Sequence, residues 1–322
     1  MLTGVLRKFL NAVLLLLAVL VLNFALIHAA PGDPVEALVG EMGGATPEVI
    51  ADLRAQFGLD QPLYIQIGTY LGRVLQGDLG HSLYYDLPVT QLIADRIGPT
   101  VLLVITALFS AIVIGTMLGV FSAQNRRSAL SHLVTVIALA GFSAPVFWVG
   151  IMLILLLSVS FPLLPISGMT GSDGAATGLA HVLDVAHHLI LPALTLALIY
   201  LAFYSRLSRA SMLEVLGSDY VRTARAKGLT RRQVIYKHAL RNAVLPVVTF
   251  AGLQFGQVIS GAVLVETVFA WPGLGTLAFD SILRRDTPTL LGILFFSALM
   301  VVVMNLLTDI VYRRIDPRIK TK

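Results

Sequence analysis

The stretch SDYVRTARAKGLTRRQVIYKHALRNAVLP, from Ser218 to Pro246, is a polar and basic island in an otherwise apolar sequence. Its pattern predicts two short helices joined at Gly228. Ser218 is placed to cap the first helix, and Gly228 can adopt the left-handed conformation that ends it. Thr230 and Gln233 have capping-box spacing, which predicts a second helix that runs until Pro246 removes a backbone donor.

The composition around this island is that of a membrane protein. The 322 residues are 57% hydrophobic and 13% charged, with a mean hydropathy of +0.84, far from the values of soluble domains. The net charge of +5 could suggest nucleic-acid binding. In a membrane protein, however, basic residues gather on the cytoplasmic side for topological reasons, so we expect no nucleic-acid partner. We therefore predict an all-α polytopic membrane protein.

Six apolar runs are predicted to cross the roughly 30 Å hydrocarbon core. They cover residues 9–27, 100–123, 133–159, 189–203, 247–265 and 289–310. The first is too long for a signal-peptide core and no Ala-x-Ala site follows it, so we expect it to be retained. The fourth is short, and we expect it to extend by about a turn at either end. The predicted organisation is an N-terminus with the first transmembrane helix (1–30), an extracytoplasmic loop with short helices (31–98) and a core with five transmembrane helices (99–322).

The charges in the connections assign the two sides. Residues 206–245 hold nine basic and two acidic residues, and the tail after Asp309 holds five basic residues. Residues 30–98 hold nine acidic and three basic residues instead. Because Lys and Arg concentrate in cytoplasmic loops, we expect both termini and the island to be cytoplasmic.

Two short helices are predicted in the long outer loop, at 47–57 and 62–76. The second places five apolar residues on one face: Leu63, Ile67, Tyr70, Leu71 and Val74. Such a face needs a partner. The partner is either the protein's own bundle or another protein that docks from outside.

Ionisable residues are absent from the centres of the apolar runs, and Asp309 lies only at the end of the last run. Ion-coupled transporters usually place such groups near the midplane, so this pattern disfavours a secondary carrier. The chain also lacks a G-x-x-x-x-G-K-[ST] phosphate-binding loop. We predict no catalytic residue, no metal site and no cofactor, and we interpret His181, His187 and His188 as ordinary interfacial histidines.

Two ladders of small residues predict close helix packing. The first is Gly115 with Gly119, and the second is Gly252, Gly256 and Ser260. Contacts between helices of this chain are one explanation for both ladders. For the second ladder, the neighbouring Gln254 and Gln257 also allow a polar face that lines a pathway or meets another membrane subunit. We favour a translocation pathway that includes Gln254, Gly256, Gln257 and Ser260.

The charges of the island have two interpretations. They could bind anionic lipid head groups of the membrane, each with a contribution of about 1 kcal/mol at most. Alternatively, the two capped helices form a rigid projection that docks into a partner, with room for a close neighbour at Ala224 and Ala226. The regular caps favour docking.

The island resembles the EAA segment of ABC importer membrane subunits. In the form DYVRTARAKGL followed by HALRNAVLP, it is similar to the dipeptide, oligopeptide and nickel permease family, and closest to its dipeptide branch. Arg222 and Thr223 precede Ala224 where the generic motif begins with Glu, and Arg225 replaces its second alanine. Further matching stretches are PGDPV (31–35), FGLDQPLYIQ (57–66), GDLGHS (77–82), ASMLEVLGSDY (210–220), ETVFAWPGLG (266–275) and DPRIK (316–320).

The resemblance implies a permease subunit of type I ABC importer architecture in the bacterial inner membrane. The implied partners are a homologous second permease subunit, two cytoplasmic ATPase subunits and an extracytoplasmic solute-binding protein. Segment 218–246 is implied to be the coupling segment, with ATPase-coupling residues Asp219, Arg222, Thr223, Ala224, Arg225, Ala226, Lys227, Gly228 and Leu229. Small peptides are the expected solute, with nickel, glutathione or other small solutes as alternatives. A stand-alone channel or secondary carrier is the remaining alternative.

Overall fold

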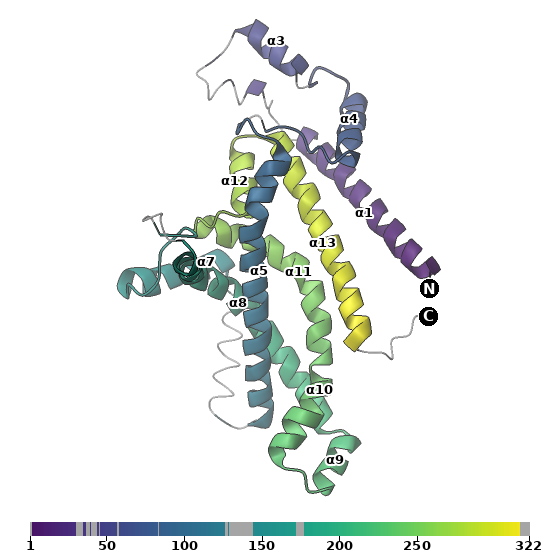
Figure 1. The fold of residues 1–322 in the computed structure, drawn as a ribbon, viewed down its shortest axis with the longest axis vertical. Helices are drawn as coiled ribbons and strands as arrows, with labels where there is room; N and C mark the ends of the chain where they lie inside the picture. Colours follow the sequence, from purple (N-terminus) through teal and green to yellow (C-terminus); the bar gives the residue numbers. More distant parts are fainter. Residues whose placement is uncertain are drawn as a thin grey trace. The chain divides into compact units, whose positions relative to one another are not determined.

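The computed structural model describes residues 2–29, 35–36, 39, 44, 46–56, 58–82, 84–125, 128, 144–171 and 177–315. The described chain is helical and divides into two compact units (Figure 1). Unit 1 combines Met1–Gly98 with Gly273–Val302, and unit 2 combines Pro99–Pro272 with Val303–Lys322.

Unit 1 is built from helices at the two ends of the chain. It contains α1 (Leu2–Ala29), α3 (Pro47–Gln56), α4 (Leu63–Leu75), the first turns of α5 (Val89–Gln124), α12 (Leu274–Leu283) and most of α13 (Thr287–Ile315). Apolar residues from five of these helices form one buried cluster: Leu20, Val74, Leu79, Val89, Leu92, Ile93, Leu274, Leu277 and Ile293. Burial of these side chains holds the outer-loop helix α4 to the rest of the unit.

The apolar face of α4 packs against the chain itself. Val74 is buried, and Tyr70 stacks on Phe24 of α1 with 5.9 Å between the ring centroids. Burial raises the pKa of Tyr70 to about 12. Leu63, which the helical pattern places on the same face, is 58% exposed, so packing against the chain itself covers only part of this face. Tyr70, Leu71 and Val74, which join the buried cluster, lie in the C-terminal half of α4.

Unit 2 contains most of α5 and the helices that lie between α5 and α12 in the sequence. They are the remainder of α5, then α7 (Val146–Ile154) with the π-helix η1 (Leu155–Ser160), α8 (Leu179–Leu216), α9 (Asp219–Ala226), the π-helix η2 (Gln233–Ala239), α10 (Leu240–Ala243) and α11 (Leu245–Val268). Helices α7, α8 and α11 pack against one another. The end of α13 also belongs to this unit.

The glycine ladder of α5 is confirmed as a site of close packing within the chain. A Cβ atom added at Gly115 lies 2.9 Å from the carbonyl oxygen of Leu201 on α8, and one added at Gly119 lies 2.5 Å from that of Ser205. Only glycine allows the two backbones to approach this closely. On α11, a Cβ atom added at Gly261 lies 3.3 Å from a side-chain carbon of Leu196 on α8.

Three helices in the described part of the chain are long and apolar enough to cross a membrane: Val89–Gln124, Leu179–Leu216 and Thr287–Thr308. The second is much longer than the run at 189–203 and extends well beyond the single turn expected at each end. Polar and basic residues continue the helix, because helical hydrogen bonding does not require an apolar sequence. Shorter apolar helices occur at Leu10–Leu26, Val146–Ser160 and Leu274–Leu283. The count of six spans stays a prediction, and residues 133–143 of the third run lie outside the described part.

Candidate coupling site

Segment 218–246 folds as a helix, a glycine corner and a second helical stretch. Helix α9 ends at Ala226, and Gly228 has a φ of +76°, in the left-handed region that favours glycine. The backbone N–H of Thr230 donates to the Gln233 side chain at 3.0 Å, and the Gln233 N–H donates to the Thr230 hydroxyl at 3.4 Å. The glycine corner and the capping box are therefore confirmed.

Two local details differ from the prediction. Ser218 occupies the N-cap position, but its hydroxyl donates to the carbonyl of Val215 at 2.6 Å and makes no capping bond. The second helix becomes a π-helix from Gln233 to Ala239 before it returns to α-geometry. That stretch ends at Ala243, three residues before the predicted stop. Pro246 does not end it but lies in the first turn of α11, where its missing donor is not needed.

The coupling segment is anchored by one apolar cluster. Val221 and Ala224 of α9 are buried against Val120 of α5 and Met212 of α8. The second helical stretch adds Val234, Ile235, Ala239 and Ala243 to the cluster. Each fully buried branched side chain contributes about 1.5–3 kcal/mol, so the projection is fixed to the long helices as a rigid element.

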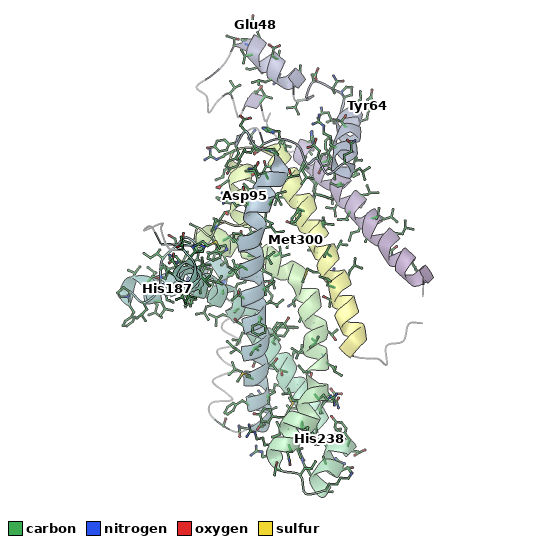
Figure 2. The ribbon with its side chains drawn as sticks, in the orientation of Figure 1. Glu48, Tyr64, Asp95, His187, His238 and Met300 are labelled. Atoms are coloured by element: carbon green, nitrogen blue, oxygen red, sulfur yellow. The ribbon has the colours of Figure 1, made fainter. Side chains whose placement is uncertain are left out.

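Polar contacts add to this anchoring. Asn242 donates to the Tyr220 hydroxyl at 2.7 Å, which joins α10 to α9. The Arg231 guanidinium donates to the carbonyl of Gln124 at 3.3 Å, at the last residue of α5. Arg225 and Arg231 also line a cavity of about 550 Å³ at the ends of α5 and α8. Figure 2 shows His238 in the same part of unit 2, on η2.

The predicted coupling residues divide into two groups. Ala224 is buried in the anchoring cluster and Leu229 is half-buried against it, so both face their own chain. The others are exposed: Asp219, Arg222, Thr223, Arg225, Ala226, Lys227 and Gly228. Arg222 pairs with Asp219 at 3.4 Å, but an ion pair this exposed contributes little to stability. The face open to a partner is cationic, with the small Ala226 among the charges.

The predicted pathway residues lie on α11. Gln254 and Gly256 are half-buried in unit 2. The side chains of Gln257 and Ser260 lie outside the described part of the structure. The pathway assignment therefore stays a prediction.

Two of the three histidines of α8 have partners within their own chain. His188 lies 3.1 Å from the carboxylate of Asp184, and His187 lies 3.2 Å from the carbonyl of Leu163. Within the described residues, three or more candidate ligands do not gather at any point. Figure 2 shows His187 on α8.

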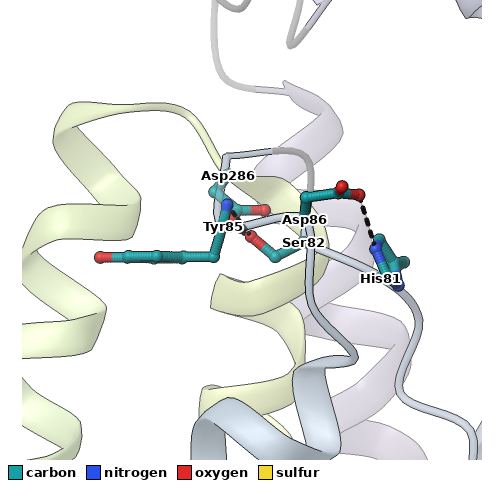
Figure 3. Close-up of polar contacts among 5 residues, drawn as sticks. All are labelled: His81, Ser82, Tyr85, Asp86 and Asp286. Atoms are coloured by element: carbon teal, nitrogen blue, oxygen red, sulfur yellow. Dashed lines mark hydrogen bonds and ion pairs between the residues drawn. The ribbon is translucent and has the colours of Figure 1, made fainter.

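A buried polar cluster ties segment 81–86, just before α5, to the connection between α12 and α13. Asp286 is 1% exposed and accepts a hydrogen bond from the hydroxyl of Ser82 (Figure 3). It accepts a second hydrogen bond from the hydroxyl of Thr289. Beside it, Arg284 lies over the ring of Tyr84 at 3.7 Å, and His81 pairs with the exposed Asp86 at 3.0 Å. Ser82 and Asp286 are 204 positions apart, so no sequence pattern signals this contact.

We expect Asp286→Asn to destabilise the contact between segment 81–86 and the connection between α12 and α13. The amide oxygen can still accept from both hydroxyls, which share one acceptor atom, but both bonds weaken without the charge, at a cost of about 1.5–3 kcal/mol. Thermal unfolding of the purified transporter and limited proteolysis of segment 58–82 measure the change. Asp86→Asn makes the same chemical change at an exposed pair and should leave both unchanged; equal behaviour of the two variants contradicts the role of Asp286.

A second polar cluster was missed by the sequence analysis. Glu266, the first residue after the predicted run at 247–265, lies in the last turn of α11 and is 0% exposed. The hydroxyl of Thr100 on α5 donates to its carboxylate at 2.6 Å. The only signal for this residue was its place in the ETVFAWPGLG stretch.

Two family models match the chain. The model for a binding-protein-dependent transport system inner membrane component matches residues 115–321, and the model for the N-terminal part of such membrane components matches residues 1–104.

Curated relatives match nearly the whole chain. The dipeptide transport system permease protein DppB of Escherichia coli (strain K12) is 43% identical over 339 residues, with 100% of both chains covered. The di/tripeptide transport system permease protein DppB of Pseudomonas aeruginosa (strain UCBPP-PA14) is 43% identical, with 94% of both covered. The oligopeptide transport system permease protein AppB of Bacillus subtilis (strain 168) is 40% identical, with 98% of both covered.

A solved structure shares the fold. An inward-facing conformation of the MetNI methionine ABC transporter matches with a TM-score of 0.57 and 18% identity, over 70% of this chain and 97% of the other.

Proposed function

Because the chain belongs to the family of binding-protein-dependent transport system inner membrane components, we propose that it imports small peptides and receives the force of ATP hydrolysis through segment 218–246. The chain is a multi-pass membrane protein and a permease subunit of an ABC importer. It is not an enzyme, since separate subunits of such importers carry the ATPase activity.

The observation that carries the coupling role is the two-sided construction of α9. Its buried side, with Val221 and Ala224, joins the apolar cluster between α5 and α8. Its other side exposes four charged residues and Ala226: Asp219, Arg222, Arg225 and Lys227. A lipid-binding signal needs charge but no fixed shape. A segment that transmits force from an ATPase needs a rigid connection to the transmembrane helices. The segment has that connection, because α10 leads within two residues into α11.

The proposed assembly follows the family. A homologous second permease subunit completes the pathway, two ATPase subunits each receive a coupling segment, and a solute-binding protein delivers the solute from outside. Both termini and segment 218–246 face the cytoplasm in this arrangement, and the chain crosses the inner membrane six times. The excess of basic residues in 206–245 supports this orientation.

Small peptides are the proposed solute. Relatives that match this chain over its full length are named as dipeptide, di/tripeptide and oligopeptide permeases. The half-buried Gln254 on α11 supplies an amide suited to peptide backbone groups, and we assign Gly256, Gln257 and Ser260 to the same pathway face. Uptake of a labelled dipeptide by the reconstituted importer tests this; competition by nickel salts or glutathione but not by other dipeptides contradicts it.

Cross-linking tests the docking of α9. The chain has no cysteine, so Ala226→Cys introduces a single reactive site without other changes. A short bifunctional thiol reagent should join this residue to an ATPase subunit carrying a cysteine in its membrane-facing groove. Ala224→Cys, two positions away but only 6% exposed, is the matched control and should give little product. Failure of Ala226→Cys in a complex that still transports contradicts the docking role.

A further inference from the structure

The outer end of α11, defined by the proposed orientation as the end away from segment 218–246, carries a buried carboxylate that the coupling role does not use. Glu266 is 0% exposed, and Thr100 on α5, 2% exposed, donates to it at 2.6 Å. Removing a carboxylate from water is costly, so a buried one is retained only where its surroundings compensate it. The position of this carboxylate, at the contact between α11 and α5, indicates a role in holding these two helices together.

A second bond joins the same two helices one residue away. The indole Nε1–H of Trp271, a residue fully buried just beyond α11, donates to the carbonyl of Pro99 at 2.9 Å. Pro99 lies inside α5, where its ring removes one helical hydrogen bond. Consecutive residues of α5, Pro99 and Thr100, are thus bound by the C-terminal end of α11.

A strained turn aims Trp271 at this point. The backbone N–H of Trp271 donates to the backbone carbonyl of Glu266 at 2.8 Å. The backbone N–H of Ala270 donates to the carbonyl of Thr267 at 3.3 Å, and together these are the bonds of a Schellman turn. Ala270 sits at the left-handed position of this turn, with a φ of +48°, where glycine is ordinarily found. The turn thus places both bonding residues, Glu266 and Trp271, on one side.

Helix α11 links this point to the coupling segment. It starts at Leu245, two residues after α10, and runs through 24 residues to Val268. At about 1.5 Å per residue it is a rod of about 36 Å, with the coupling segment at one end and Glu266 at the other. If the helix stays intact, a displacement of one end moves the other end as well.

We propose that Glu266, Thr100, Trp271 and Pro99 form a latch that holds the outer end of α11 against α5 and sets how tightly ATP hydrolysis is coupled to import. The inference rests on the proposed coupling function of segment 218–246. Glu266 and Thr100 act as positioning residues: with the latch closed, α11 pivots about its outer end. With the latch open, the helix slips at that end, and ATP is hydrolysed without matching import.

The test compares Thr100→Val with Thr100→Ser in the complete transporter, reconstituted in vesicles with its binding protein. Valine keeps the shape and removes the hydroxyl, whereas serine keeps the hydrogen bond. A bond to a carboxylate biases a two-state equilibrium by about tenfold or more, so we expect the ATP hydrolysed per solute imported to rise about tenfold in Thr100→Val and to stay at the wild-type value in Thr100→Ser. Combining Thr100→Val with Glu266→Gln should change this ratio by less than the product of the two single effects, since both substitutions weaken the bond between Thr100 and Glu266.

Two further measurements separate the possible failures. Ala270→Gly should leave the ATP hydrolysed per solute imported unchanged. Ala270→Val, with a β-branched residue at a positive φ, should raise this ratio as Thr100→Val does. Co-purification of the ATPase subunits is measured for every variant. If the subunits co-purify and the ratio is unchanged in Thr100→Val, the latch is wrong while the coupling role stands. If serine and valine at position 100 change the ratio equally, a purely structural role replaces the latch. If ATPase subunits do not bind the wild-type chain, the coupling function itself is wrong.

Discussion

Transport is expected to stop when Gly228 is replaced by valine, although the chain should still insert and assemble. The φ of Gly228 is +76°, and an added Cβ meets nothing within 4 Å, so the obstacle is backbone conformation rather than a clash. A β-branched residue disfavours this region strongly. The corner between α9 and the Thr230 capping box then changes direction, and the cationic face of α9 no longer meets its partner. Solute uptake and solute-stimulated ATP hydrolysis measure the loss.

Gly228→Asn is the matched control for this prediction. Asparagine enters the left-handed region far more readily than valine and places a side chain in the same open space. We expect it to retain most of the uptake, and alanine to be intermediate. If valine transports as well as asparagine, the direction of the corner has no part in coupling.

The second large effect is expected at Gly119. A Cβ atom there lies 2.5 Å from the carbonyl oxygen of Ser205, 2.7 Å from the Cβ of Ser208 and 2.9 Å from the backbone nitrogen of Arg209. Two of these are backbone atoms, which cannot turn aside as a side chain does. Gly119→Ala must therefore separate α5 from α8, at a cost of about 1–3 kcal/mol or more. Valine at this position should prevent recovery of a folded complex, as judged by yield and thermal unfolding.

A glycine on α4 provides the comparison. An added Cβ at Gly68 meets nothing within 4 Å, and alanine favours a helix by about 0.5–1 kcal/mol over glycine. Gly68→Ala should therefore leave thermal stability unchanged or slightly higher. A Gly119→Ala variant as stable as Gly68→Ala would show that α5 and α8 do not pack this closely.

Short-range features of segment 218–246 were correctly predicted because they depend on neighbouring residues. The positive φ at Gly228 follows from the absence of a side chain, and the Thr230–Gln233 box follows from a spacing of three residues. Ser218 is the exception. Its hydroxyl could bond either forward to the helix it precedes or back to Val215, and the sequence holds no information that separates the two.

The side on which each residue of α9 lies could not be predicted in the same way. Ala224 and Ala226 are the same amino acid two positions apart, yet the first is buried and the second exposed. The difference arises because α5 and α8 approach α9 from one direction, which depends on the packing at Gly115 and Gly119. The sequence therefore predicts room for a close neighbour at both alanines and does not distinguish them.

The sequence by itself determined that this is a helical membrane protein with a capped, basic, two-part segment, because hydrophobic runs, glycine and capping residues act through interactions within a few positions. Only the tertiary structure decided which face of that segment is anchored, and which distant residues meet. Thr100 and Glu266 are 166 positions apart, and Ser82 and Asp286 are 204 apart. Such pairs form when packed helices bring them together, and the hydrogen bonds that result are too specific in direction to follow from residue type alone.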